Sequence, residues 1–266
     1  MGEALVTAAD AVLHYEAGDW DTALAEVASL KEFLPPYGMA PAAWLPWQAY
    51  GLAALIAAHR GQGATADALL AQLPEHKHPA RSDDAIRSRA GFALAARAAR
   101  AEQSGRTDVA LDLLAAALVA DIGQKQSWLP PFARLALDAG RRDLLEAAAQ
   151  SAETGVSDSA AEKALARHMR GLAQGDAELL AAAARHYKSA SRRFDLGRVE
   201  EDLAALTAAS GDPVNARRHL LRAVEAYVVL GAKAEMLRAD ARLLRSGVQR
   251  SRRATTPDRR GGRSPG

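Results

Sequence analysis

A glycine recurs along this chain at positions 18, 61, 105, 140, 175 and 211, each time between two stretches rich in Ala and Leu. The last three intervals are 35, 35 and 36 residues, and the first two are 43 and 44. A glycine just past the end of a helix adopts positive φ at little steric cost, so it ends one helix and lets the chain turn. Repetition of this stop at about 35 residues is typical of arrays of helix pairs.

The residues after these glycines indicate helix starts. Asp follows at positions 19, 176 and 212, where a carboxylate accepts hydrogen bonds from free amides, and Pro213 suits the first helical position. We therefore expect antiparallel helix pairs over 3–17/20–33, 46–60/63–73, 85–104/107–120, 128–139/142–153, 158–174/177–191 and 196–210/213–230, then a last helix over 233–245.

Two positions at fixed distances from each glycine are mostly small. Seven residues before it stand Ala11, Ala54, Ala98, Ala133, His168 and Ala204, and five residues after it stand Ala23, Ala66, Ala110, Leu145, Leu180 and Ala216. Small side chains allow two antiparallel helices to approach closely. The two sets therefore predict the contact between the helices of each pair.

Composition supports an all-helical chain. Ala, the best helix former, accounts for 64 of the 266 residues. The sequence contains no Cys, which excludes disulfides and thiolate chemistry and suits a reducing, cytoplasmic location. The uncharged stretch from Phe33 to Ala58 is broken by four prolines and leaves fewer than the ~20 residues that a membrane span needs, so it predicts a buried helix.

Positive charge is concentrated at the end of the chain. Residues 247–266 contain six arginines and one acid, whereas the formal net charge of the whole chain is only +2. A segment so rich in Arg, Gly and Ser is predicted to be a disordered tail. It would serve either as an inert linker or as a non-specific contact to nucleic-acid phosphates through Arg250, Arg252, Arg253, Arg259, Arg260 and Arg263.

The repeats resemble those of the tetratricopeptide family. The stretch "GDWDTAL" (18–24) is similar to the family's Gly-Asp-aromatic-x-x-Ala-Leu core, with Trp20 in the aromatic packing slot. The resemblance implies that residues 1–246 form a right-handed α-solenoid of about six degenerate helix pairs plus a terminal helix. Leu145, Leu180 and His168 depart from the small residues of the pattern.

A second resemblance covers the stretch 211–254, "GDPVNARRHLLRAVEAYVVLGAKAEMLRADARLLRSGVQRSRRA". It looks like the final repeats of large LuxR-type transcriptional regulators of the actinobacterial kind. In that family an ATPase module precedes the repeats and a DNA-binding helix-turn-helix follows them. Here no G-x-x-x-x-G-K-[ST] motif occurs, and the chain stops before a DNA reader. The resemblance implies a non-enzymatic sensor or scaffold region; the alternative is a stand-alone protein-interaction adaptor.

No catalytic, cofactor-binding or metal-binding residue is predicted. His-Glu-x-x-His and Gly-x-Ser-x-Gly are absent, and the loop histidines His76 and His78 are more typical of a solvated connector than of a metal site. The tetratricopeptide resemblance implies a concave groove that would take a protein or a small apolar effector. Its residues would be Leu5, Ala8, Val12, Tyr15, Leu165, Met169, Leu172, Glu201 and Ala205, although ordinary packing between helices is the favoured interpretation of these side chains.

Overall fold

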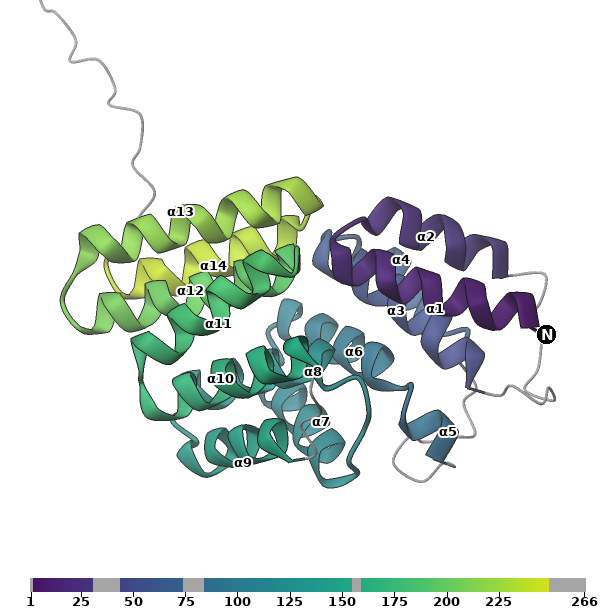
Figure 1. The fold of residues 1–266 in the computed structure, drawn as a ribbon, viewed down its shortest axis with the longest axis horizontal. Helices are drawn as coiled ribbons and strands as arrows, with labels where there is room; N and C mark the ends of the chain where they lie inside the picture. The colour runs from purple at the N-terminus through teal and green to yellow at the C-terminus, as the bar shows by residue number, and fades with distance from the viewer. Residues whose placement is uncertain (1, 31–43, 74–83, 155–158, 249–266) are drawn as a thin grey trace, which may run out of the picture.

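The six glycines form turns between helices in the computed structural model, which describes residues 2–30, 44–73, 84–154 and 159–248. Each has a positive φ, between 65° and 85°, and each separates two helices as predicted. The described residues are helical without strands (Figure 1). The helices are α1 (Gly2–Ala17), α2 (Trp20–Ser29), α3 (Leu45–His59), α4 (Gly63–Leu70), α5 (Asp84–Arg87), α6 (Gly91–Gln103), α7 (Thr107–Val119), α8 (Lys125–Asp138), α9 (Arg142–Glu153), α10 (Ala160–Gln174), α11 (Ala177–Ser189), α12 (Arg193–Ala209), α13 (Pro213–Leu230) and α14 (Lys233–Arg245).

The predicted helix caps are also confirmed. The carboxylates of Asp19, Asp176 and Asp212 accept hydrogen bonds from backbone amides at the starts of α2, α11 and α13. Each bond satisfies an amide that has no partner inside its helix. Pro213 is the first residue of α13, where its missing N–H costs no hydrogen bond.

All twelve side chains at the two fixed positions beside the glycines are buried. The larger Leu180 fits because Gly171 of α10 faces it: a Cβ on Gly171 would lie 2.9 Å from Leu180 Cδ2. His168, the polar exception, is fully buried and contacts the Asp202 carboxylate at 2.9 Å. The departures at Leu180 and His168 are therefore compensated by specific neighbours.

The prediction of one helix over 85–104 is wrong, because the chain breaks between α5 and α6. The Arg87 carbonyl accepts a hydrogen bond from Gly123 N (3.0 Å), and the Gln124 side chain accepts one from Phe92 N (3.2 Å). The loop before α8 thus provides hydrogen-bond partners for backbone groups that the interrupted helix leaves without one. Gly91 allows this crossing, since a Cβ there would lie 2.4 Å from the Gly123 carbonyl oxygen.

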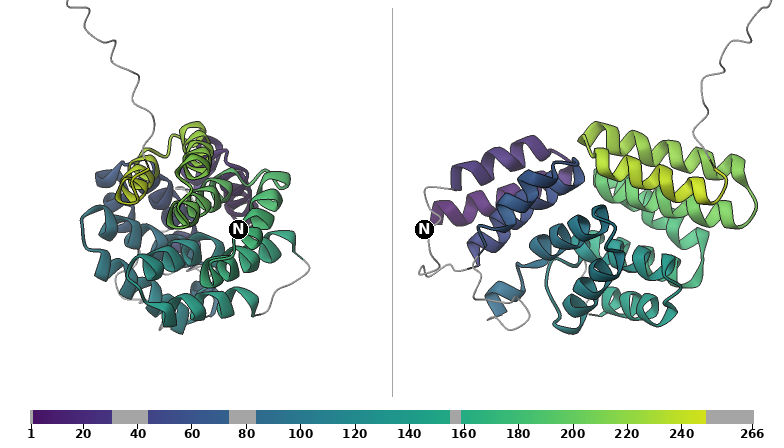
Figure 2. Two further views of the ribbon diagram at one scale, coloured as in Figure 1. Left: turned by 90° about the vertical axis from the view of Figure 1, so that its left-hand side faces the viewer. Right: turned by 180° about the vertical axis from the view of Figure 1, so that it is seen from behind.

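The two ends of the helical array meet. In Figure 1 and in the right-hand view of Figure 2, α1–α4 lie beside the ends of α12–α14, although these segments are far apart in sequence. Trp20 of α2 and His59 of α3 contact the ring of Phe194 on α12, with centroids 5.1 Å and 4.5 Å away. Arg192, which precedes α12, forms an ion pair with Glu16 of α1 at 2.9 Å. The helices therefore enclose a common interior.

None of the helices within the described ranges is long and apolar enough to cross a bilayer. The stretch for which a buried helix was predicted contains α3, whose residues from Leu52 to Ala58 are all buried. At the other end, Gly247 and Val248 still belong to the folded body: Val248 is buried, and its amide donates to the Leu243 carbonyl.

Candidate functional site

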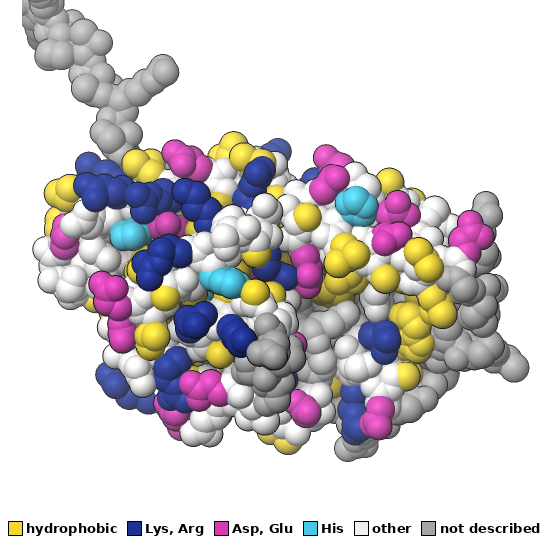
Figure 3. All heavy atoms as spheres, viewed as in Figure 1, with side chains coloured by type: hydrophobic (Ala, Val, Ile, Leu, Met, Phe, Trp, Pro, Cys, Tyr) yellow, Lys and Arg dark blue, Asp and Glu magenta, His cyan; other side chains and the backbone are white. Residues whose placement is uncertain are grey.

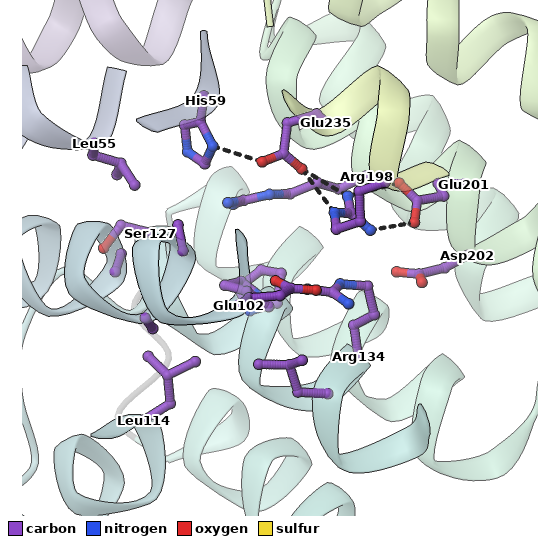
Figure 4. A pocket seen from close by; sticks show the side chains of 17 residues that line it. Leu55, His59, Glu102, Leu114, Ser127, Arg134, Arg198, Glu201, Asp202 and Glu235 are labelled. Atoms are coloured by element: carbon purple, nitrogen blue, oxygen red, sulfur yellow. Dashed lines mark hydrogen bonds and ion pairs between the residues drawn. The ribbon is translucent and has the colours of Figure 1, made fainter. Parts of the chain in front are cut away.

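A cluster of buried charged side chains joins α3, α12 and α14 (Figure 4). His59, the last residue of α3, contacts Glu235 of α14 with 2.7 Å between Nδ1 and Oε1. Arg238, one turn along α14, donates to Glu235 and also to both carboxylate oxygens of Glu201 on α12. These contacts connect the first part of the array to its last described helix.

Glu201 is the hub of this interior ion cluster. Its side chain is 1% exposed and accepts hydrogen bonds from Arg238, from Arg242 at 3.1 Å and from the Tyr227 hydroxyl at 3.0 Å. Arg242 also donates to Asp202 at 2.6 Å. Buried charges persist in a protein only when they are paired in this way.

The surroundings fix the ionisation of these groups. Burial on its own would raise the pKa of Asp202, but the charge of Arg242 and the hydrogen bonds from His168 and Arg242 hold that pKa below its ordinary value. Arg238 and His59 likewise outweigh burial and lower the pKa of Glu235. Burial lowers the pKa of His59 despite the opposing effect of Glu235, so the ring is neutral near pH 7 and its Nδ1–H donates to Glu235.

The cavity beside the cluster is small. It is lined by Leu55, Leu114, Glu102 and Arg134 as well as by the cluster, and its volume of about 30 Å³ is close to that of one water molecule. Arg134 contacts Glu102 at 2.6 Å, so its charge is also paired. An organic ligand does not fit this cavity. The cluster therefore acts as a structural connection between α3, α12 and α14.

The residues predicted for the concave groove do not form one open surface. Ala8, Tyr15, Leu165 and Met169 are buried between helices, and Tyr15 packs against Trp20 and Phe92. Glu201 is the buried hub described above, whereas Leu5 is 39% exposed. Val12 and Tyr15 line a small pocket of about 60 Å³. Trp20 is buried, as its packing slot predicts.

Leu172 and Ala205 line a pocket of about 300 Å³ between α8, α10, α12 and α14. Its walls include Leu137 and Leu206, and its charged groups are Asp138, Asp202, Arg242 and Arg245. This volume is at the lower end of the range for small-molecule sites. Arg242 and Asp202 belong to both the pocket and the interior ion cluster.

Sequence reasoning missed both the ion cluster and a second, wider groove over α11, α12 and α13. The charged residues of the cluster are scattered over 183 positions of the chain, and each alone is typical of a solvated helix face.

The arginines predicted to contact nucleic acid, from Arg250 to Arg263, lie outside the described residues, as do His76 and His78. In the part of the chain that the structure covers, no group of three or more His, Asp or Glu side chains could hold a metal ion.

The fold and the site together define a class: an all-helical protein of glycine-hinged helices, closed by a buried ion cluster, with a ligand-sized pocket beside it. No family model matches the chain, and no curated protein or solved structure shows significant similarity to it.

Proposed function

We propose that this protein is a non-enzymatic sensor and scaffold, built as a right-handed tetratricopeptide-like solenoid, that belongs to the repeat region of a LuxR-type transcriptional regulator. It binds a small effector with an apolar body in the pocket between α8, α10, α12 and α14, which we call the effector pocket. The observation that carries this proposal is the position of Arg242, which lines the pocket and also donates to Asp202 and Glu201 of the ion cluster.

Because Arg242 belongs to both the pocket and the ion cluster, it can couple effector binding to the way in which α14 is held. An effector with a negatively charged group would compete with Asp202 and Asp138 for Arg242, whose guanidinium lies 2.6 Å and 3.5 Å from their carboxylates. Arg242 is part of α14, the last described helix, so a change in its pairing alters how α14 is held. A ligand shifts a conformational equilibrium only through such differential contacts. Binding would thereby be passed to the segment after α14.

The pocket can be tested with the fluorescent probe anilinonaphthalene sulfonate, which has an apolar body and one negative charge. We expect saturable binding to the full chain. Ala209 is exposed at the pocket edge, so Ala209→Trp should block the probe without disturbing the core. Ala241→Trp, at an exposed α14 position outside the pocket lining, is the control. If the probe binds Ala209→Trp and Ala241→Trp equally well, the pocket is not its binding site and this part of the proposal is wrong.

The regulator role has a separate test. The genomic sequence beyond codon 266 should encode a helix-turn-helix, and the full chain should bind random duplex DNA with an affinity that falls steeply between 50 and 200 mM salt. Deleting residues 250–266 should abolish that affinity and leave the urea unfolding midpoint unchanged. An unrelated downstream gene, together with salt-insensitive DNA binding, would favour the stand-alone adaptor instead.

A further inference from the structure

A second candidate binding surface, separate from the effector pocket, is the groove over α11, α12 and α13. It has a volume of about 620 Å³, and none of its lining residues was predicted as a site. Arg185 and Lys188 of α11 form one wall, His219 and Arg222 of α13 form the other, and α12 provides the floor. Figure 3 shows dark-blue Lys and Arg side chains gathered over this part of the molecule, together with His.

The groove is electropositive. Four cationic side chains line it against two carboxylates, Glu200 and Glu225. The Glu200 charge is already offset, because its carboxylate lies 2.6 Å from His219 Nδ1 and 3.7 Å from Arg222. Among the described residues, no ion pair neutralises the exposed Arg185, Lys188 and Arg193. These three cations are therefore free to pair with a ligand.

The floor of the groove is apolar. Leu196 and Leu203 are seven residues apart on α12 and both line the groove, as does Val229 of α13, which is 62% exposed. The lining runs along α12 from Arg193 to Leu203, or about 15 Å at the rise of an α-helix. This is the length of about three helical turns. Apolar contacts on the floor and positive charge at the edges match an amphipathic helix with acidic flanks.

The lining argues against nucleic acid as the occupant. It contains no Phe, Tyr or Trp on which bases could stack. Glu225, exposed on α13, would repel a phosphate backbone, whereas it can accept from a basic or polar side chain of a peptide. Protein recognition is therefore the better match.

We propose that the groove over α11, α12 and α13 binds an acidic amphipathic helix of a partner protein, about three turns long. Leu-type side chains of the partner contact Leu196 and Val229, and its Asp or Glu side chains pair with Arg185, Lys188 and Arg193. The groove shares no lining residue with the effector pocket, so the two proposals can fail independently.

The test is selection from a phage-displayed library of helical peptides on the full-length protein. We expect enriched peptides to carry Leu at a spacing of three or four residues and several acids beside them. The variant Arg185→Glu/Lys188→Glu should bind them at least roughly tenfold more weakly, since it reverses two charges on one wall. The control Arg142→Glu/Arg167→Glu makes the same change of net charge at exposed positions of α9 and α10 and should bind normally.

A second pair of variants tests the floor without changing the arginines. Val229→Glu places a carboxylate in the groove and should also weaken binding, whereas Val228→Glu alters an exposed neighbour that does not line it. The proposal is overturned if the library yields no binder at about 100 μM, if the selected peptides lack acids, or if both variants of a pair bind equally. Direct binding of random duplex DNA to the native chain, lost in the Arg185→Glu/Lys188→Glu variant and kept in the control, would instead identify a nucleic-acid interface.

Discussion

Replacement of Glu201 by Gln tests whether the interior ion cluster holds the molecule closed. The change keeps the size of the side chain and removes one negative charge at a position that is 1% exposed. Arg238 then loses the carboxylate to which it donates at 2.5 Å and 2.8 Å, and Arg242 loses a contact of 3.1 Å. Both arginines stay buried with less compensation.

The expected cost follows from this geometry. Removing one partner of a buried ion pair typically destabilises a protein by about 3–5 kcal/mol, because the remaining charge is left in a poorly solvated site. The Gln carbonyl can still accept one hydrogen bond, so we expect the free energy of unfolding to fall by about 3 kcal/mol. Glu225→Gln removes the same charge from an exposed position of α13 and should change it by less than ~0.5 kcal/mol.

The assay is urea unfolding followed by circular dichroism, with midpoint and slope fitted separately. Hydrogen exchange adds a local measurement: amides of α14 should exchange faster in Glu201→Gln, since Arg238 and Arg242 connect α14 to α12. If the unfolding free energy falls by less than ~1 kcal/mol at an unchanged slope, and α14 keeps its protection, the cluster does not hold the helices together.

Three further changes probe the hinges, the helix packing and the ionisation of the interior. Gly105 has positive φ and open space around it, so Gly105→Val should lower the unfolding free energy by more than ~1 kcal/mol and by more than Gly105→Asn does; equal urea midpoints would contradict the hinge. Gly51→Ala brings a Cβ to 2.8 Å from the Ala93 backbone nitrogen and should cost about 1–3 kcal/mol despite the better helix propensity of Ala; a raised midpoint would show that α3 and α6 can separate. The lowered pKa of His59 means that its contribution is present above pH 6.5 and is lost as pH falls below that value, so the midpoint should drop between pH 7 and 5 in the native chain; an identical drop in His59→Gln would assign it to other groups.

Local features of the fold could be predicted because their causes are local. A glycine at the end of a helix, a following Asp and a nearby Ala are all within a dozen residues of one another, and the structure has each in the predicted role at Gly18 and Gly211. The break between α5 and α6 could not be predicted in this way. It depends on Gly123 and Gln124, which lie more than 30 residues along the chain from the break itself.

The site residues likewise divide into those that local sequence could predict and those that depend on distant parts of the chain. Offsets from the glycines located Leu172 and Ala205, which line the effector pocket, since a pocket between helix pairs follows from the repeat. They could not show that Tyr15 and Met169 are covered, because the coverage comes from helices packed across the interior. Nor could they indicate that Glu201 would meet Arg238, a residue 37 positions away on a helix outside the six pairs.

The contact between His59 and Glu235 also constrains the order in which this protein can fold during its synthesis on the ribosome. The two residues are separated by 176 positions, so at about 5–20 residues per second His59 waits roughly 9–35 s for its partner to be synthesised. Helix hairpins form far faster than that, in microseconds to milliseconds. During translation the early helices therefore exist with Trp20 and His59 uncovered until α12 supplies Phe194, and His59 stays without its carboxylate partner until α14 is made.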